Sequence, residues 1–177
     1  MIKRKPLIRR VNVSVRTKLI PALLTAVSLA LLIFLLHEFS IGIETGLGSS
    51  VVIFASFAAS AFILFMAPHT RAAKPSKFVK GYIIGGVLGY AGFLLSGLIG
   101  IYAAVLIMMF LLALFLVILK AEHPPAAGIA LAFLLYGVGY IGILIVIVAA
   151  LAMLLIRFFL ERLVYEIEAD FVKLEKK

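Results

Sequence analysis

The stretch Glu122–Gly128, which reads Glu-His-Pro-Pro-Ala-Ala-Gly, interrupts a chain that is otherwise almost continuously hydrophobic. Proline fixes its own φ, lacks an amide hydrogen and pushes the preceding residue out of the helical region. The apolar helix that arrives over residues 106–120 must therefore end by about Glu122. Proline also suits the first helical turn, so Pro124 or Pro125 is well placed to begin the next helix. The stretch thus predicts two helices that meet at a proline turn.

This turn also contains the strongest candidate binding site. The first free backbone amides of the new helix would belong to Ala126, Ala127 and Gly128, whose small side chains leave the backbone accessible. A helix N-terminus carries partial positive charge and is suited to binding an anion. The alternative interpretation is a plain turn between two membrane helices, with His123 solvated beside it.

Composition places the chain in a membrane. Hydrophobic residues make up 65% of the 177 residues and charged residues 14%, against about 45–50% and 25% in soluble domains. Cysteine is absent, which excludes disulfides and thiolate metal sites. The net charge is +9, and most of the basic residues lie beside the apolar segments. This distribution is typical of a membrane protein that is attracted to anionic lipid. No nucleic-acid partner is expected.

The first half of the chain predicts two membrane spans. Residues 1–18 form a basic leader, which we expect to be cytoplasmic. An apolar run of 18 residues follows at 19–36 and is interpreted as an uncleaved first span. The second span covers 47–67, where Ser56 and Ser60 lie among alanines and indicate a helix-packing face. Pro68 and His69 end this span.

Residues 81–119 form a run of 39 residues without charge. A single helix of that length would measure about 58 Å, nearly twice the hydrocarbon core, so the run must cross twice and turn near 96–100. Gly81, Gly85 and Gly89 recur at four-residue intervals, which predicts close packing against another helix.

The last apolar run, residues 124–156, is long for one span and short for two. We favour a short half-helix over 125–135, a break within 136–140 and a full span over 141–156; one long tilted helix is the alternative. Residues 157–177 are expected to form an amphipathic helix with a heptad seam, which packs on the body or lipid surface or joins another subunit. The seam consists of Leu160, Val164, Ile167, Phe171 and Leu174.

The predicted architecture is therefore an all-α polytopic membrane bundle of four to six hydrophobic helices, with its transmembrane domain over 19–156. With the N-terminus inside, every basic loop falls on the cytoplasmic side. The chain has no catalytic motif, so no enzyme activity is expected. His69, His123 and Glu122 lack metal-site spacing, and we expect neither a metal nor another cofactor.

Several ordered elements resemble the HPP family of small polytopic membrane proteins, which takes its name from His123-Pro124-Pro125. Residues 56–61 (Ser-Phe-Ala-Ala-Ser-Ala) are similar to that family's Ser-Phe-Gly-Ala-Ser-Ala segment, and 67–69 and 73–75 are similar to its Ala-Pro-His and Ala-Gln-Pro elements. The chain departs from the pattern at 75–77 and 80–82, where the family often has Pro-Arg-Asn and Gly-Gly-His. If the family's histidine or arginine contacts the substrate in its relatives, the substrate of this chain is expected to differ.

The resemblance implies a four-span membrane protein and, because plastid and cyanobacterial members are associated with nitrite transport, a transporter or channel for a small anion. The expected substrate-binding residues surround the proline turn, and the expected setting is a homo-oligomer in the plasma membrane of a prokaryote. A structural or regulatory membrane module without flux is the alternative function. The expected binding residues are His123, Pro124, Pro125, Ala126, Ala127, Gly128, His69 and Lys74.

Overall fold

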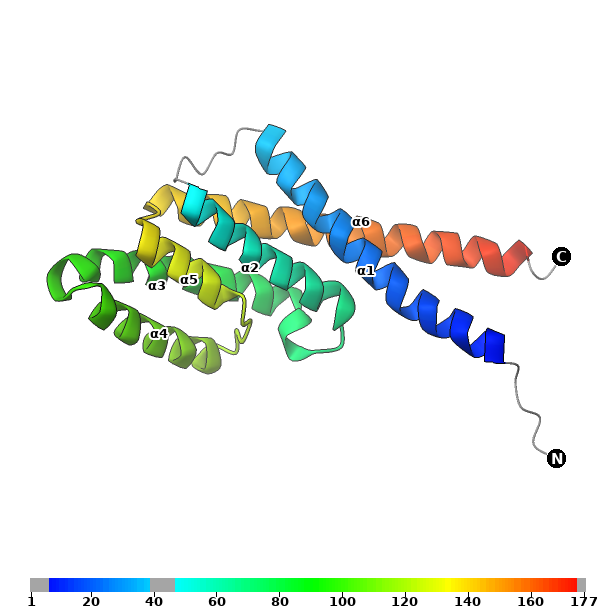
Figure 1. The fold of residues 1–177 in the computed structure, drawn as a ribbon, viewed down its shortest axis with the longest axis horizontal. Coiled ribbons are helices and arrows are strands. Elements are labelled where there is room, and N and C mark those ends of the chain that lie inside the picture. The colour runs from blue at the N-terminus through cyan, green and yellow to red at the C-terminus, as the bar shows by residue number, and fades with distance from the viewer. Residues whose placement is uncertain (1–6, 39–46, 175–177) are drawn as a thin grey trace, which may run out of the picture.

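The computed structural model describes residues 7–38 and 47–174, with side chains described over 19–35 and 51–162. Over these residues the chain forms α-helices and one short 3-10 helix (Figure 1). The elements are α1 (Leu7–Glu38), α2 (Leu47–Met66), η1 (Arg71–Ala73), α3 (Pro75–Ile99), α4 (Ile101–Ile118), α5 (Ala126–Tyr136) and α6 (Tyr140–Leu174). The prediction of an all-helical membrane bundle is confirmed.

Helices α3 and α4 form a tight hairpin. Pro75 occupies the first turn of α3, as its fixed φ favours. The predicted turn at 96–100 contracts to Gly100, which has a φ of 83°. Only glycine adopts that backbone readily, so one residue suffices to reverse the chain.

Helix α5 has 11 residues and packs against the middle of the α3–α4 hairpin. It ends at Gly137, in the left-handed region at φ 64°, and α6 begins at Tyr140. The structure thus contains two helices here, and not one long tilted helix. Near its start, Ala126 packs against Gly85, and at its end Gly137 meets the ring of Phe93.

Both ends of α5 lie well inside the length of α3. The Cβ of His123, just before α5, lies 3.0 Å from the position of a Cβ on Gly81, six residues after Pro75 begins α3. Phe93, beside the end of α5, lies six residues before Ile99 ends α3. At 1.5 Å per residue, each end of α5 is recessed by about 9 Å. Helix α5 is therefore a half-helix within the bundle.

The close approach of α3 and α5 depends on glycine. A Cβ on Gly85 would lie 2.6 Å from the carbonyl oxygen of Ala126, and a Cβ on Gly89 would lie 2.5 Å from that of Ala130. Gly81 faces the loop before α5 with a looser fit, since a Cβ there would lie 3.0 Å from the Cβ of His123 and 3.3 Å from the carbonyl oxygen of Ala121. The glycine row therefore lies along the contact between α3 and α5, where no side chain fits.

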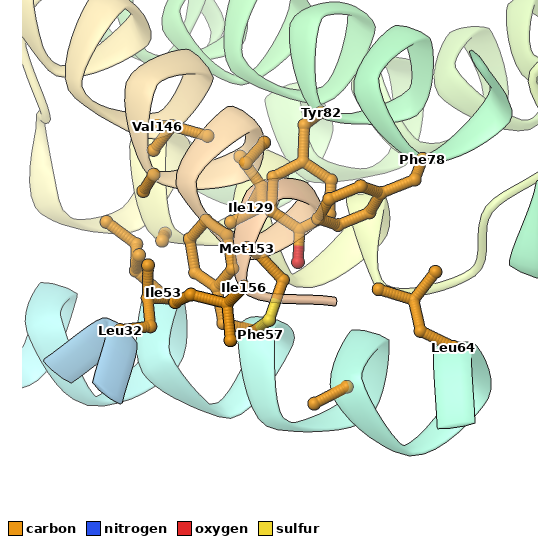
Figure 2. Packing of buried hydrophobic residues seen from close by; sticks show 14 of the residues in the cluster. Leu32, Ile53, Phe57, Leu64, Phe78, Tyr82, Ile129, Val146, Met153 and Ile156 are labelled. Carbon is orange, nitrogen blue, oxygen red and sulfur yellow. The ribbon is translucent and has the colours of Figure 1, made fainter. Parts of the chain in front are cut away.

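Two apolar clusters meet on adjacent faces of α5. Ile129, Ala132 and Phe133 belong to the larger cluster, which α1, α2, α3 and α6 also form (Figure 2). Ala126, Ala130 and Leu134 belong to a second cluster with α4. The spacing of these two sets places them on different faces of one helix. Helix α5 is consequently buried on two adjacent faces.

Three helices in the described part of the chain are long and apolar enough to cross a membrane: α3, α4 and residues Tyr140–Arg162 of α6. Shorter apolar segments lie at Leu19–Leu35, Val51–Met66 and Ala126–Tyr136. Helix α6 continues without a break to Leu174, so the tail extends the last span instead of forming a separate helix. Most of the heptad seam lies outside the residues whose side chains are described.

Lys120 supplies a stability prediction. It follows α4 with a φ of 51°, a left-handed conformation that costs non-glycine residues about 1 kcal/mol or more. We expect Lys120→Gly to stabilise the protein by about 0.5–1 kcal/mol, measured by denaturant unfolding in detergent. Lys80→Gly is the matched control, since Lys80 is exposed inside α3 and the change should cost about 1 kcal/mol. Equal effects of the two changes would contradict the assignment of strain to Lys120.

Candidate functional site

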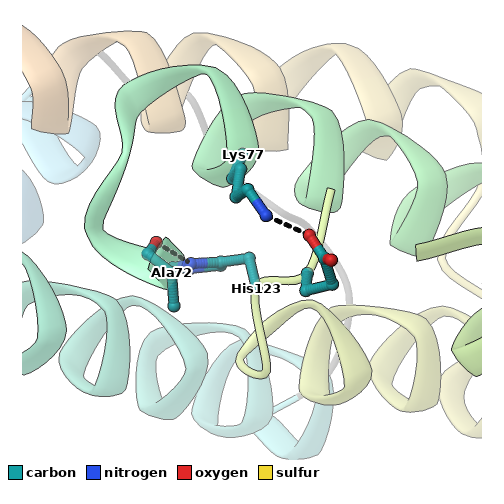
Figure 3. Close-up of polar contacts among 4 residues, drawn as sticks. Ala72, Lys77 and His123 are labelled. Atoms are coloured by element: carbon teal, nitrogen blue, oxygen red, sulfur yellow. Dashed lines mark hydrogen bonds and ion pairs between the residues drawn. The ribbon is translucent and has the colours of Figure 1, made fainter. Parts of the chain in front are cut away.

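His123 lies buried just before the N-terminal end of α5, with none of its surface exposed. Its Nδ1 atom lies 2.9 Å from the carbonyl oxygen of Ala72 in η1 (Figure 3). Its Nε2 atom lies 2.8 Å from the hydroxyl of Ser60 in α2. The ring therefore joins the α4–α5 loop to both α2 and the α2–α3 loop.

Hydrogen-bond chemistry assigns the tautomer of this ring. A carbonyl oxygen only accepts, so Nδ1 carries the hydrogen that is donated to Ala72. In a neutral imidazole Nε2 is then an acceptor, and Ser60 donates to it. The Tyr82 hydroxyl lies 2.7 Å from the Ser60 oxygen and donates in turn. The result is a directed chain from Tyr82 through Ser60 and His123 to Ala72.

Ser60 has a second acceptor within reach. Its hydroxyl oxygen lies 3.0 Å from the carbonyl oxygen of Ser56, one turn earlier in α2. A hydroxyl carries a single hydrogen, so Ser60 donates either to His123 or to Ser56. The two acceptor distances are similar, and a neutral His123 with its hydrogen on Nδ1 needs the Ser60 hydrogen at Nε2.

Aromatic rings enclose His123. The ring centroid of Phe78 lies 5.1 Å away at 71°, and that of Tyr82 lies 5.7 Å away. Burial among these rings lowers the pKa of His123 below its ordinary value near 6.5, although the Ala72 carbonyl opposes the shift. His123 is therefore neutral at physiological pH.

Charged side chains gather just outside the polar cluster. Lys77, at the start of α3, pairs with Glu122 and lowers the pKa of that carboxyl group (Figure 3). Arg157 of α6 donates to the carbonyl oxygen of Ala73 at 3.0 Å and to Glu161 at 2.7 Å. The η1 turn is thus held by His123 on one carbonyl and by Arg157 on the next.

The structure corrects the hypothesis of free amides at the start of α5. The amide of Ala126 donates to the His123 carbonyl at 3.0 Å. The amides of Ala127 and Gly128 donate to the carbonyls of Pro124 and Pro125, each at 3.1 Å. The two prolines form a helical turn before α5, and their carbonyls occupy these donors. These three amides are therefore not free donors at the start of α5.

The remaining predicted residues divide between the interior and the surface. Pro125 and Ala126 are buried, whereas Pro124, His69 and Lys74 are exposed, the last two in or beside the loop that contains η1. A Cβ on Gly128 would lie 2.2 Å from the Ser56 hydroxyl, so Gly128 packs directly on Ser56. A larger residue at 128 would disturb this packing as well as any access route.

The tertiary structure adds residues that the sequence pattern did not assign to the site. Ser56 and Ser60 were predicted to pack helices, yet Ser60 hydrogen-bonds to His123 across 63 positions of sequence. Tyr82 and Arg157 had no predicted role. The available signal was a serine in the middle of an apolar span, since polar side chains within a membrane usually mark functional positions.

The buried state of His123 predicts an acid-sensitive fold. Because the folded-state pKa lies below the unfolded value near 6.5, the unfolded chain binds the proton more tightly. The stability contribution of the neutral ring is complete above about pH 6.5 and is lost as pH falls toward the folded-state pKa. The hydrogen bond from Lys77 holds the pKa of Glu122 below its ordinary value, so this carboxyl group titrates only at lower pH. Thermal unfolding between about pH 7.5 and 5 should show this loss in wild type and a flatter profile in His123→Gln. A variant profile parallel to that of wild type would contradict the assignment.

The described residues contain no group of three or more His, Cys, Asp and Glu side chains placed to hold a metal ion. The fold and site define a helical membrane protein with a broken half-helix and a buried cluster of hydroxyl and imidazole groups. A family model described as "HPP, transmembrane region" matches residues 10–168. The chain belongs to this family, as its His-Pro-Pro stretch and serine segment predicted. No curated protein and no solved structure matches the chain.

Proposed function

We propose that this protein transports a small inorganic anion, with nitrite as the leading candidate, across the membrane. The observation that carries the proposal is the recessed half-helix α5 with the buried Ser60, Tyr82 and His123 cluster at its N-terminal end. Half-helices ending at membrane depth are characteristic of transporter binding sites. A purely structural bundle has little reason to bury an imidazole and two hydroxyls there, since burying polar groups carries a cost.

The chemistry of the cluster suits a small oxyanion better than a cation. Tyr82 and Ser60 carry hydroxyl groups that can donate hydrogen bonds, and both residues are fully buried beside aromatic rings. An anion that leaves water needs its hydration replaced by such donors. Exposed Arg71, Lys74 and Lys120 lie in the adjacent loops and would raise the local anion concentration.

The alternative is a structural or regulatory membrane module without flux. One observation favours it: His123, Ser60 and Tyr82 satisfy one another by hydrogen bonds within the chain. Transport then requires that these bonds be exchanged when the anion binds. A flux measurement separates the two functions, since only a transporter carries nitrite.

Nitrite uptake into proteoliposomes tests the proposal. Wild type should take up nitrite faster than protein-free vesicles, and Tyr82→Phe should lower the rate about tenfold by removing one buried donor. Ser96→Ala is the matched control, because the Ser96 hydroxyl is bonded to the carbonyl of Phe93 near the α3–α4 turn. Wild-type vesicles no faster than protein-free vesicles would leave the structural role as the function.

We propose a cytoplasmic location for the end that contains this site. The His123–Ala72 and Lys77–Glu122 contacts place the α2–α3 and α4–α5 loops at one end of the bundle, and Arg157 joins them there through Ala73. Basic residues favour the cytoplasmic side. Labelling from each side of a cysteine introduced at Lys74 tests this orientation. A prokaryotic plasma membrane and a homo-oligomeric state stay predictions.

A further inference from the structure

We infer that the anion crosses the membrane together with one proton, which His123 carries on Nε2. This inference rests on the proposed transport function and adds the coupling ion to it. It assigns His123 as the proton-binding residue and Ser60 as the residue that positions its hydrogen bond. The substrate class is then a monovalent anion that is the conjugate base of a weak acid. One proton enters with each anion, so transport carries no net charge.

The first argument is the charge balance of the cluster. A single negative charge in a buried site is strongly unfavourable without a counter-charge, and so is a single imidazolium. Lys77 and Arg157, which border this cluster through Glu122 and the Ala73 carbonyl, are already engaged, Lys77 with Glu122 and Arg157 with Glu161. Binding the anion and the proton together leaves the site neutral, so each favours the other.

The groups that face His123 from each neighbouring element support this balance. Within the described side chains, the ring meets hydroxyls, aromatic rings and a carbonyl, while charged groups lie one step further out. The groups that contact the ring are Ser60 from α2, Phe78 and Tyr82 from α3, and the Ala72 carbonyl from η1. The charged groups further out are Lys77 in the first turn of α3, exposed Arg71 in η1, Arg157 of α6, which reaches Ala73, and Glu122 in the same loop as His123. His123 is thus the group in this cluster that gains a positive charge.

The second argument is the paired acceptors of Ser60. In the neutral state Ser60 donates to Nε2 of His123, 2.8 Å away. When hydronium delivers a proton to the Nε2 lone pair, an N–H bond forms there and water leaves. The Ser60 hydroxyl hydrogen then turns to the Ser56 carbonyl, 3.0 Å away, and its oxygen accepts from Nε2. Every donor keeps a partner in both states.

Protonation also releases a donor for the anion. Once Nε2 of His123 donates a hydrogen bond to the Ser60 oxygen, that oxygen accepts a hydrogen bond even without Tyr82. The Tyr82 hydroxyl, 2.7 Å from Ser60, can then turn its hydrogen to the anion without leaving an unsatisfied buried group. The same proton therefore supplies the counter-charge and exposes the donor.

Nitrite uptake under imposed gradients tests the coupling. In wild-type proteoliposomes an inward proton gradient should drive nitrite accumulation above that of protein-free vesicles, and a potassium–valinomycin potential should leave the initial rate unchanged. Uptake that responds to the potential and not to the proton gradient would leave anion transport intact and overturn coupling. Absence of protein-dependent uptake would overturn the transport function and the coupling with it.

A second measurement does not depend on flux. Protein labelled with [15N]histidine, in detergent at about pH 6, should show the His123 signal move to the imidazolium position on addition of nitrite. His69, which is exposed, serves as the internal control, and His123→Gln identifies the signal. In Ser60→Ala the nitrite concentration at half shift should rise about tenfold. A His123 signal unchanged by nitrite would overturn the inference.

Discussion

Gly89→Ala is expected to destabilise the protein by about 3 kcal/mol or more, enough to prevent purification of a folded form. The added Cβ would lie 2.5 Å from the carbonyl oxygen and 2.8 Å from the Cα of Ala130, and 2.8 Å from the Cβ of Phe133. These are backbone and near-backbone atoms, so α3 and α5 must separate. In lipid, helix association depends on such close packing.

Gly86→Ala is the matched control for this change. Gly86 lies in the same helix, but its Cβ would meet Ile143 at 3.5 Å, which is ordinary contact. We expect it to be neutral or to stabilise the protein by up to about 1 kcal/mol through helix propensity. The measurement is denaturant unfolding in detergent, with oligomer size by gel filtration. Equal midpoints for the two variants would show that α3 and α5 do not pack as described. Gly85→Leu should behave like Gly89→Ala.

His123→Ala is expected to destabilise the protein by about 2–4 kcal/mol. The change removes a fully buried ring and leaves the Ala72 carbonyl without its side-chain donor, while the Ser60 hydroxyl keeps only the Ser56 carbonyl as acceptor. It also releases the α4–α5 loop from η1. Thermal unfolding near neutral pH measures the loss in the state where the ring is neutral.

His69→Ala is the matched control, because it makes the same chemical change at an exposed histidine and should alter stability by less than about 0.5 kcal/mol. The two histidines were predicted to act together beside the anion, and the structure places only His123 in the buried cluster. Equal losses for the two variants would contradict that difference.

Most helix boundaries could be predicted from the sequence. The charge-free run at 81–119 had to turn because a single helix would exceed the bilayer, and the turn lies at Gly100. The break between α5 and α6 at Gly137 follows the glycine pattern predicted for 136–140. These features depend on local backbone preference and on bilayer thickness, which act on consecutive residues.

The residues of the candidate site were harder to predict from local sequence. The proline turn was correctly chosen as the organising feature, yet its amides are occupied by the carbonyls of His123, Pro124 and Pro125. The groups that define the cluster are Ser60, Tyr82 and the Ala72 carbonyl, which come from α2, α3 and η1. Nothing in a single helix shows which polar side chain meets another across the bundle.

The sequence by itself determined a helical membrane protein, the place of the half-helix, and the glycine row at 81, 85 and 89. Each of these follows from hydrophobic length, residue size or proline chemistry. Only the tertiary structure decided that α5 packs into two apolar clusters and that His123 bonds to Ser60 and Ala72. Those contacts join residues 63 and 51 positions apart, and they form because a buried imidazole must find partners wherever the packed helices present them.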